Sequence, residues 1–81
     1  MVCYLKLNMR MPKQDTLDAY YYDYDVQFID LSRYDDYEED VQEVYVVGKW
    51  ENIVKYLMDA CPLVQTLSNL KVLVQNIQHF N

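Results

Sequence analysis

The first residues of the chain alternate between apolar and polar side chains. In residues 2–9, "VCYLKLNM", every second side chain is apolar, and these four would lie on one side of an extended backbone: Cys3, Leu5, Leu7 and Met9. A period of two predicts a strand with one buried face. We expect this strand to end before Pro12, because proline has no N–H group to donate to a sheet.

The next segment fits two patterns. Leu17, Tyr20, Tyr21 and Tyr24 recur at helical spacing, whereas the apolar residues from Tyr22 to Phe28 alternate with polar ones, and tyrosine favours strands. We predict a strand over residues 21–31, and we leave open whether residues 15–21 form a short helix or an extended lead into it. In such a strand Asp23 and Asp25 project into solvent. The residues expected to face the core are Tyr22, Tyr24, Val26 and Phe28.

A third strand is predicted over residues 41–47, where β-branched and aromatic residues dominate. The stretch before it, "SRYDDYEED", has no apolar period and is typical of a connecting loop. Gly48 is the one glycine of the chain, and we expect it to allow a positive φ where the strand turns into a helix.

Two amphipathic helices are predicted after Gly48. The first covers residues 50–60 and has one apolar face, made of Trp50, Ile53, Val54, Leu57 and Cys61. Pro62 is expected in the first turn of the second helix, where the missing N–H costs nothing. That helix covers residues 63–80, with an apolar stripe of Leu63, Leu67, Leu70, Leu73, Val74, Ile77 and Phe80.

These elements predict an α+β fold, in which a three-stranded antiparallel sheet packs against two C-terminal helices in the order βββαα. A chain of 81 residues is expected to form a single small domain, residues 1–81. The composition is 52% hydrophobic and includes one glycine and two prolines, which argues for a folded chain.

The negative charge of the chain is concentrated in one segment. The net charge is −6, but residues 15–43 hold eleven of the thirteen acids and one of the seven bases, so this segment carries −10 and the remainder +4. Six of the nine tyrosines lie in the same segment. Such a run of like charges is tolerated in a solvated loop, and it is useful where a basic partner supplies the countercharge.

Motifs for catalysis or cofactor binding are not evident in the sequence. Cys3 and Cys61 lack the spacing of a zinc or redox pair and are expected to be reduced and buried, and His79 lacks a second ligand nearby in the sequence. The chain also lacks a glycine-rich phosphate loop, and its carboxylates do not follow the spacing of a standard calcium loop. We therefore expect a protein without enzymatic activity, cofactor or metal ion. The N-terminus is neither a signal peptide nor a membrane span, so we expect a soluble protein of the cytoplasm, with no membrane partner.

The acidic residues expected to face solvent form the candidate interface with a partner. Carboxylates several ångströms apart resemble a phosphate backbone and can occupy an Arg/Lys groove made for nucleic acid, while tyrosines replace the stacking of bases. Direct binding of nucleic acid by such a surface is excluded by its sign. The candidate partner-binding residues are Asp23, Asp25, Tyr34, Asp35, Asp36, Tyr37, Glu38, Glu39 and Asp40.

In size, acidity and lack of catalytic motifs the chain resembles, as a class, the small phage-encoded inhibitors of host defence, which include anti-CRISPR proteins and DNA mimics. This resemblance implies an inhibitor that blocks a nuclease or a surveillance complex in the host cytoplasm by occupying its nucleic-acid groove. The alternative is a structural or regulatory interaction module, which could be a homodimer. In this interpretation the acids serve solubility only, and the partner contacts exposed apolar helix surface at Val64 and Val72.

Overall fold

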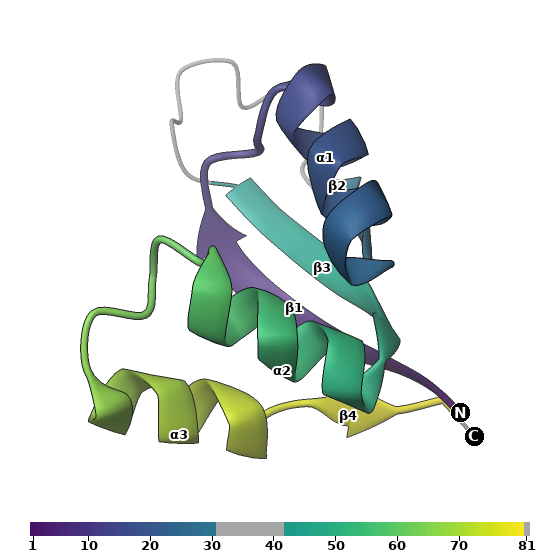
Figure 1. The fold of residues 1–81 in the computed structure, drawn as a ribbon. Helices are drawn as coiled ribbons and strands as arrows, with labels where there is room; N and C mark the ends of the chain where they lie inside the picture. Colours follow the sequence, from purple (N-terminus) through teal and green to yellow (C-terminus); the bar gives the residue numbers. More distant parts are fainter. Residues whose placement is uncertain (31–41, 81) are drawn as a thin grey trace.

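The structure, a computed structural model, describes residues 1–30 and 42–80 and contains four strands and three helices in that part of the chain (Figure 1). In chain order the elements are β1 (Val2–Met9), α1 (Gln14–Tyr24), β2 (Gln27–Asp30), β3 (Gln42–Lys49), α2 (Trp50–Asp59), α3 (Leu67–Gln75) and β4 (Gln78–His79). The fold is α+β with an antiparallel sheet, as the sequence predicts.

The strands form one sheet in the order β2-β3-β1-β4. The longest ladder joins β1 to β3 in antiparallel register, from Val2 opposite Lys49 to Met9 opposite Gln42. Strand β2 is antiparallel to β3, and β4 is antiparallel to β1. Therefore β1 and β2, which are joined through α1, are parallel with β3 between them, and β3 and β4, which are joined through α2 and α3, are parallel with β1 between them. This is a doubled split β–α–β arrangement.

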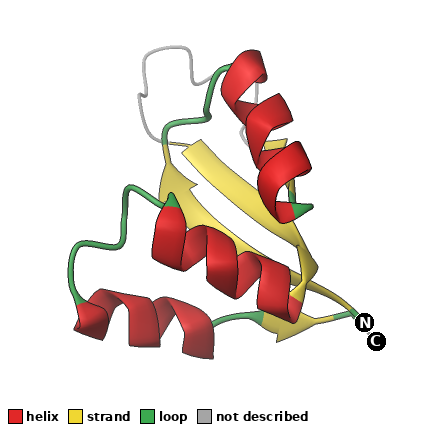
Figure 2. Cartoon of the chain, viewed as in Figure 1, coloured by secondary structure: helices red, strands yellow, loops and turns green. Residues whose placement is uncertain are grey.

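One face of the sheet carries the core. The alternation predicted for β1 is confirmed, because its odd-numbered residues are buried, and α2 covers them with Ile53, Tyr56 and Leu57. Helices α1 and α2 contact each other on this side of the sheet, and α3 packs beside α2 (Figure 2). The buried residues are Cys3, Leu5, Leu7, Met9, Val26, Val44, Val46, Ile53, Tyr56, Leu57, Cys61 and Ile77.

The predicted order βββαα is wrong at the second element. Residues 14–24 form α1, so the strand predicted over residues 21–31 is helical at its start and extended only from Gln27. The helical spacing of Leu17, Tyr20 and Tyr24 decides this, because it turns the Tyr20 ring onto Tyr56, with 5.2 Å between ring centroids. Contact with a helix distant in sequence outweighs the preference of tyrosine for strands.

The second C-terminal helix is shorter than predicted. Helix α3 begins at Leu67, where the Thr66 side chain accepts a hydrogen bond from the N–H of Asn69, and it ends at Gln75. Pro62 therefore lies in the loop before the helix. Residues 78–79 pair with Cys3 and Tyr4 as β4, because the free edge of β1 offers hydrogen bonds that the end of a helix cannot.

The remaining predicted elements are confirmed with shifted ends. The helix predicted over residues 50–60 is α2, and the strand predicted over residues 41–47 is β3, which continues to Lys49. Tyr56, absent from the predicted apolar face of α2, is wholly buried, whereas Trp50 is exposed. The core therefore uses a slightly different face of this helix.

Gly48 is needed for space and not for a positive φ. It lies within β3 and has no positive φ; that conformation belongs to Asp25, at φ 54°. A Cβ atom at Gly48 would lie 3.1 Å from the backbone oxygen of Asp25 and 3.3 Å from Cγ1 of Val26. The glycine thus lets the chain between α1 and β2 approach β3.

Four aromatic rings from three elements meet around Tyr56. The rings of Tyr20, Phe28 and Tyr24 lie 5.2, 5.3 and 6.2 Å from that of Tyr56, centroid to centroid. Among the described residues, the buried Tyr56 hydroxyl has no hydrogen-bond partner of good geometry, although the Cys61 thiol lies beside it. Burial raises the pKa of Tyr56, and the neighbouring Cys61 thiol and Tyr20 add to this effect. The ring packing therefore outweighs the cost of an unsatisfied hydroxyl.

Replacing Tyr56 with phenylalanine should stabilise the protein. Tyr56→Phe keeps the ring contacts and removes the unpaired hydroxyl, whose burial costs about 1–3 kcal/mol. We expect the free energy of unfolding, measured by urea denaturation, to rise by about 1 kcal/mol. The control Tyr22→Phe alters an 87% exposed ring and should change it little. A lower free energy of unfolding for Tyr56→Phe would contradict the interpretation that the Tyr56 hydroxyl is unpaired.

Adding a methyl group at Gly48 should destabilise the protein. The Asp25 backbone oxygen cannot rotate away from the new Cβ atom, so Gly48→Ala should lower the free energy of unfolding by about 1–3 kcal/mol in the same assay. At a strand position with open space, the same change should stabilise by about 0.4–1 kcal/mol through the unfolded state. Whether Gly48→Ala lowers or raises the free energy of unfolding therefore tests the close approach of the Asp25 backbone to Gly48.

Candidate functional site

The outer face of α1 carries carboxylates and an exposed tyrosine. Asp15, Asp18 and Tyr22 fall within an arc of about 60° around the helix, and Asp23 lies at the edge of the same face. All four are exposed, and the Tyr22 side chain is 87% accessible. From Asp15 to Asp23 the face extends for ~12 Å along the helix. We call these four residues the acidic face of α1.

The acids in the first half of α1 suit their positions. Asp15 lies in the first turn, where the positive end of the helix dipole favours a carboxylate, and its Oδ1 accepts a hydrogen bond of 2.8 Å from the N–H of Thr16. The Gln14 side chain donates to Oδ1 of Asp18 at 2.9 Å. These two carboxylates are therefore held by local contacts that stabilise the helix.

The acids at the other end of α1 destabilise the helix. Asp23 lies in the last turn, which has no basic residue, and Asp25 is the C-cap, in the left-handed region at φ 54°, where its N–H donates to the Tyr21 carbonyl. The helix dipole places partial negative charge at this end, so both carboxylates are disfavoured there. Partial burial, and then the charges of Asp59 and Asp23, raise the pKa of Tyr24 above its ordinary value. Negative charge thus gathers here at a cost in stability.

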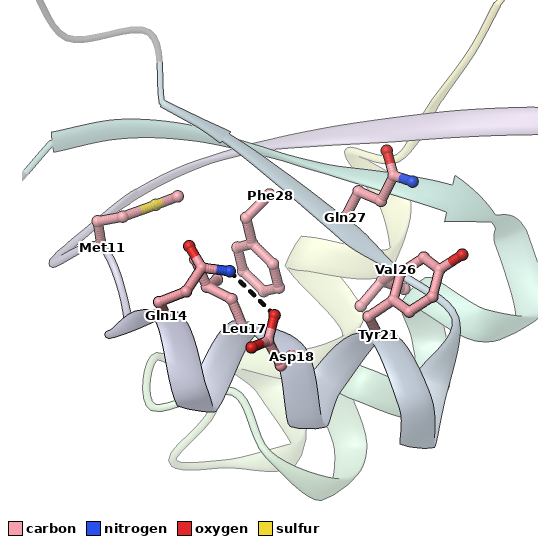
Figure 3. A pocket seen from close by; sticks show the side chains of 8 residues that line it. All are labelled: Met11, Gln14, Leu17, Asp18, Tyr21, Val26, Gln27 and Phe28. Atoms are coloured by element: carbon pink, nitrogen blue, oxygen red, sulfur yellow. Dashed lines mark hydrogen bonds between the residues drawn. The ribbon is translucent and has the colours of Figure 1, made fainter.

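A groove runs between α1 and β2, beside the acidic face (Figure 3). Its volume is about 360 Å³, and the side chains that line it are Met11, Gln14, Leu17, Asp18, Tyr21, Val26, Gln27 and Phe28. Within the described sheet β2 is an edge strand, so the groove lies next to backbone groups that do not pair with another described strand. An apolar side chain with a neighbouring cation would suit this mixture of apolar lining and carboxylate.

The structure places the predicted site residues only in part. Asp23 and Asp25 are exposed, as expected, but they lie at the end of a helix and not on a strand. Of the residues expected in the core, Val26 is buried and Tyr24 and Phe28 pack against the core, whereas Tyr22 faces solvent, since a helix turns it away from Tyr20. The other predicted interface residues lie outside the described residues: Tyr34, Asp35, Asp36, Tyr37, Glu38, Glu39 and Asp40.

Sequence reasoning missed Asp15, Asp18 and the exposed Tyr21 as site residues. The signal was available in the helical spacing of Leu17, Tyr20 and Tyr24, because that spacing places Asp15 and Asp18 on the opposite face. A strand over residues 21–31 assigns no exposed or buried face to residues 15–21, so it does not predict where Asp15 and Asp18 lie.

His79, which the sequence predicts in a helix, lies instead in β4 beside a residue from the other end of the chain. Strand β4 brings its Nδ1 to 3.1 Å from the Sγ of Cys3, so a cysteine does lie beside it. The Cys3 side chain is wholly buried, and both cysteines are free. A thiol that a substrate cannot reach suits a structural contact between β1 and β4 better than nucleophilic catalysis.

Among residues 1–30 and 42–80, His, Cys, Asp and Glu side chains do not gather in groups of three or more that could hold a metal ion. In the same part of the chain, none of the helices is long and apolar enough to cross a membrane.

Comparison with known proteins leaves the function open. No protein-family model matches the chain, and neither a curated protein nor a solved structure does. A functional proposal therefore rests on the residues and geometry described above.

Reversing the charge at Asp23 should stabilise the protein, whereas the same change at Asp15 should destabilise it. Asp23→Lys places a cation in the last turn of α1 and Asp15→Lys places one in the first, and each effect should be about 0.3–1 kcal/mol at low salt. The two variants have equal net charge, so a difference in thermal unfolding temperature reports position alone. If both variants shift in the same direction, net charge and not the helix dipole dominates.

Proposed function

We propose that this protein is a non-enzymatic binding protein whose acidic face of α1 holds a basic surface of a partner protein, one that ordinarily binds nucleic acid. The observation that carries the proposal is the placement of Asp23 and Asp25 at the negative end of α1 without a basic residue in the last turn. Residues that break a local rule at a cost in stability are expected at functional positions. A basic partner would remove that cost on binding.

The spacing of charges on α1 suits a groove built for nucleic acid. Asp15 and Asp18 are separated by ~4.5 Å along the helix axis, and successive phosphates of one DNA strand are separated by about 3.4 Å along the duplex axis. Tyr22 and Tyr21 lie beside them with accessible rings, 87% and 52% exposed, which can stack on arginine or on aromatic residues of a partner. The acidic face thus combines the two chemical features of a single strand, charge and stacking.

The groove between α1 and β2 supports the same proposal. Its lining pairs Leu17 and Phe28 with the Asp18 carboxylate, so a lysine or arginine can lay its apolar stem on these two side chains and bring its charge to the acid. The edge of β2 that does not pair with another described strand can add main-chain hydrogen bonds to an extended basic segment. The groove would therefore hold one side chain of the partner beside the wider electrostatic contact.

In this proposal the protein acts as a stoichiometric inhibitor in the cytoplasm, in the manner of DNA mimics and of anti-CRISPR proteins encoded by phages. The acids and tyrosines of residues 34–40 remain a predicted part of the interface. A second candidate is an interaction module whose acids serve solubility. On α3 the side chains of Leu67 and Val72 are exposed, which favours it, whereas Val64 packs against the core.

Neutralising the acidic face should weaken capture of a basic partner. The double variant Asp18→Asn and Asp23→Asn should lose binding about tenfold or more at low salt, and binding by the unaltered protein should fall as salt is raised. Immobilised protein, exposed to host-cell lysate at two salt concentrations and then to a short DNA duplex, measures both capture and displacement by nucleic acid.

The matched control is Glu43→Gln with Glu51→Gln, which removes the same charge from exposed positions outside α1. Unchanged capture by this control, with loss in the α1 variant, supports the proposal. Equal capture by both variants, or a captured protein that DNA does not displace, contradicts it. Loss of capture in Val72→Glu alone would favour the interaction module.

A further inference from the structure

The face of the sheet turned away from the helices has an apolar centre. Antiparallel sheets with one solvated face usually place polar residues on it. Here the even-numbered residues of β1 and the odd-numbered residues of β2 and β3 share the outer face, because the register sets Tyr4 opposite Val47 and Ile29 opposite Tyr45. The apolar side chains of this outer sheet face are Val2, Tyr4, Ile29, Tyr45, Val47 and Phe80.

Three aromatic rings form a row across this face. Tyr4 lies between Tyr45 and Phe80, with centroid distances of 5.3 and 4.7 Å. The Phe80 side chain is 52% exposed, and Val2 and Ile29, on either side of the row, are 49% and 47% exposed. None of the described helices covers these residues. A contiguous apolar surface of this kind marks a contact with another molecule.

The charges on the outer sheet face argue for a nearly neutral partner. Of the described bases, Lys6 and Lys49 belong to it, and Lys6 is paired with Glu43 at 3.7 Å. Helix α1 lies on the other side of the sheet (Figure 1), and its C-cap Asp25 reaches the edge of the outer sheet face near Val47. A nucleic acid would need several cations to hold its phosphates, and a strongly basic or acidic protein would find little countercharge. The chemistry that fits best is another apolar face rimmed by two acids and two bases.

The shape of the face also suits a second copy of itself. A contact between identical surfaces needs both a projection and a hollow on the same face. Phe80 is half exposed beyond β4, and its N–H donates a hydrogen bond of 3.1 Å to the Val2 carbonyl. A hollow of about 270 Å³ begins beside it, lined in part by Val2, Asp25, Gln27 and Val47. From strand lengths and spacings the sheet has a projected area of about 350 Å² per copy, less than half of the ~800 Å² that a stable interface buries on each partner. The contact should therefore be weak.

We propose that two copies of this protein associate through their outer sheet faces, which places two sheets in contact and leaves both α1 helices outside. This inference goes beyond the proposed function and does not depend on it. The two proposals differ in their dependence on salt. Each copy carries −6, so salt should screen the repulsion and strengthen self-association, whereas it should weaken binding of a basic partner.

Sedimentation velocity over a wide range of protein concentrations tests the proposal. The unaltered chain should form a dimer at high concentration, more readily as salt is raised. Ile29→Glu adds a carboxylate to the outer sheet face and should weaken the dimer at least tenfold, and Phe80→Ser, which adds no charge, should weaken it as well. The matched control Val72→Glu adds the same charge at an exposed position on α3 and should leave the dimer unchanged.

Three results would overturn the proposal: a chain that stays monomeric at every concentration, a dimer weakened by Val72→Glu and not by Ile29→Glu, or tight binding of a labelled single-stranded oligothymidylate that Phe80→Ser abolishes. Circular dichroism shows whether each variant is folded. If Ile29→Glu does not fold, amide NMR signals of the unaltered protein decide, because those of Val2, Ile29 and Val47 should shift on dilution and those of α3 should not.

Discussion

Burial of the Tyr56 ring is the contact on which the arrangement of the other elements depends. The ring lies against Tyr20 and Tyr24 of α1 and Phe28 of β2, so a single side chain of α2 contacts two elements that lie much earlier in the sequence. The chain has only 81 residues, and its core is correspondingly small. Without this cluster α1 would have little to pack against, since none of its residues is fully buried. The unpaired Tyr56 hydroxyl shows that ring packing outweighs hydrogen bonding at this point.

Packing of the helices on one side of the sheet gives the molecule two unlike surfaces. The side of α1 that faces solvent is acidic, because the apolar residues of the helix turn toward Tyr56 and leave Asp15, Asp18 and Asp23 outside. The outer sheet face is apolar and nearly neutral, because β1 and β3 carry tyrosine and valine where a solvated sheet would carry polar residues. A basic protein and a second copy of the chain are therefore proposed for different sides of the same sheet.

The end of α1 joins stability to the proposed function. Asp25 adopts a left-handed conformation that costs other residues more, and its backbone oxygen lies close to Gly48 of β3, so the turn into β2 is sterically fixed. Asp23 and Asp25 are held at the negative end of the helix by this rigid turn. The backbone of this turn keeps both carboxylates near that end of the helix, and a cation from a partner would relieve the repulsion.

Local pattern in the sequence determined the elements whose apolar side chains repeat along a full face, which are β1, β3 and α2. It also predicted the α+β class and the location of the acidic segment. Only the tertiary structure decided between helix and strand at residues 21–24, because both periods are present there and the contact between Tyr20 and Tyr56 selects one. It also made residues 78–79 a strand, since the edge of β1 lies far away in the sequence. The acidic face of α1 and the outer sheet face follow from those two choices, as each depends on which neighbour covers the opposite side.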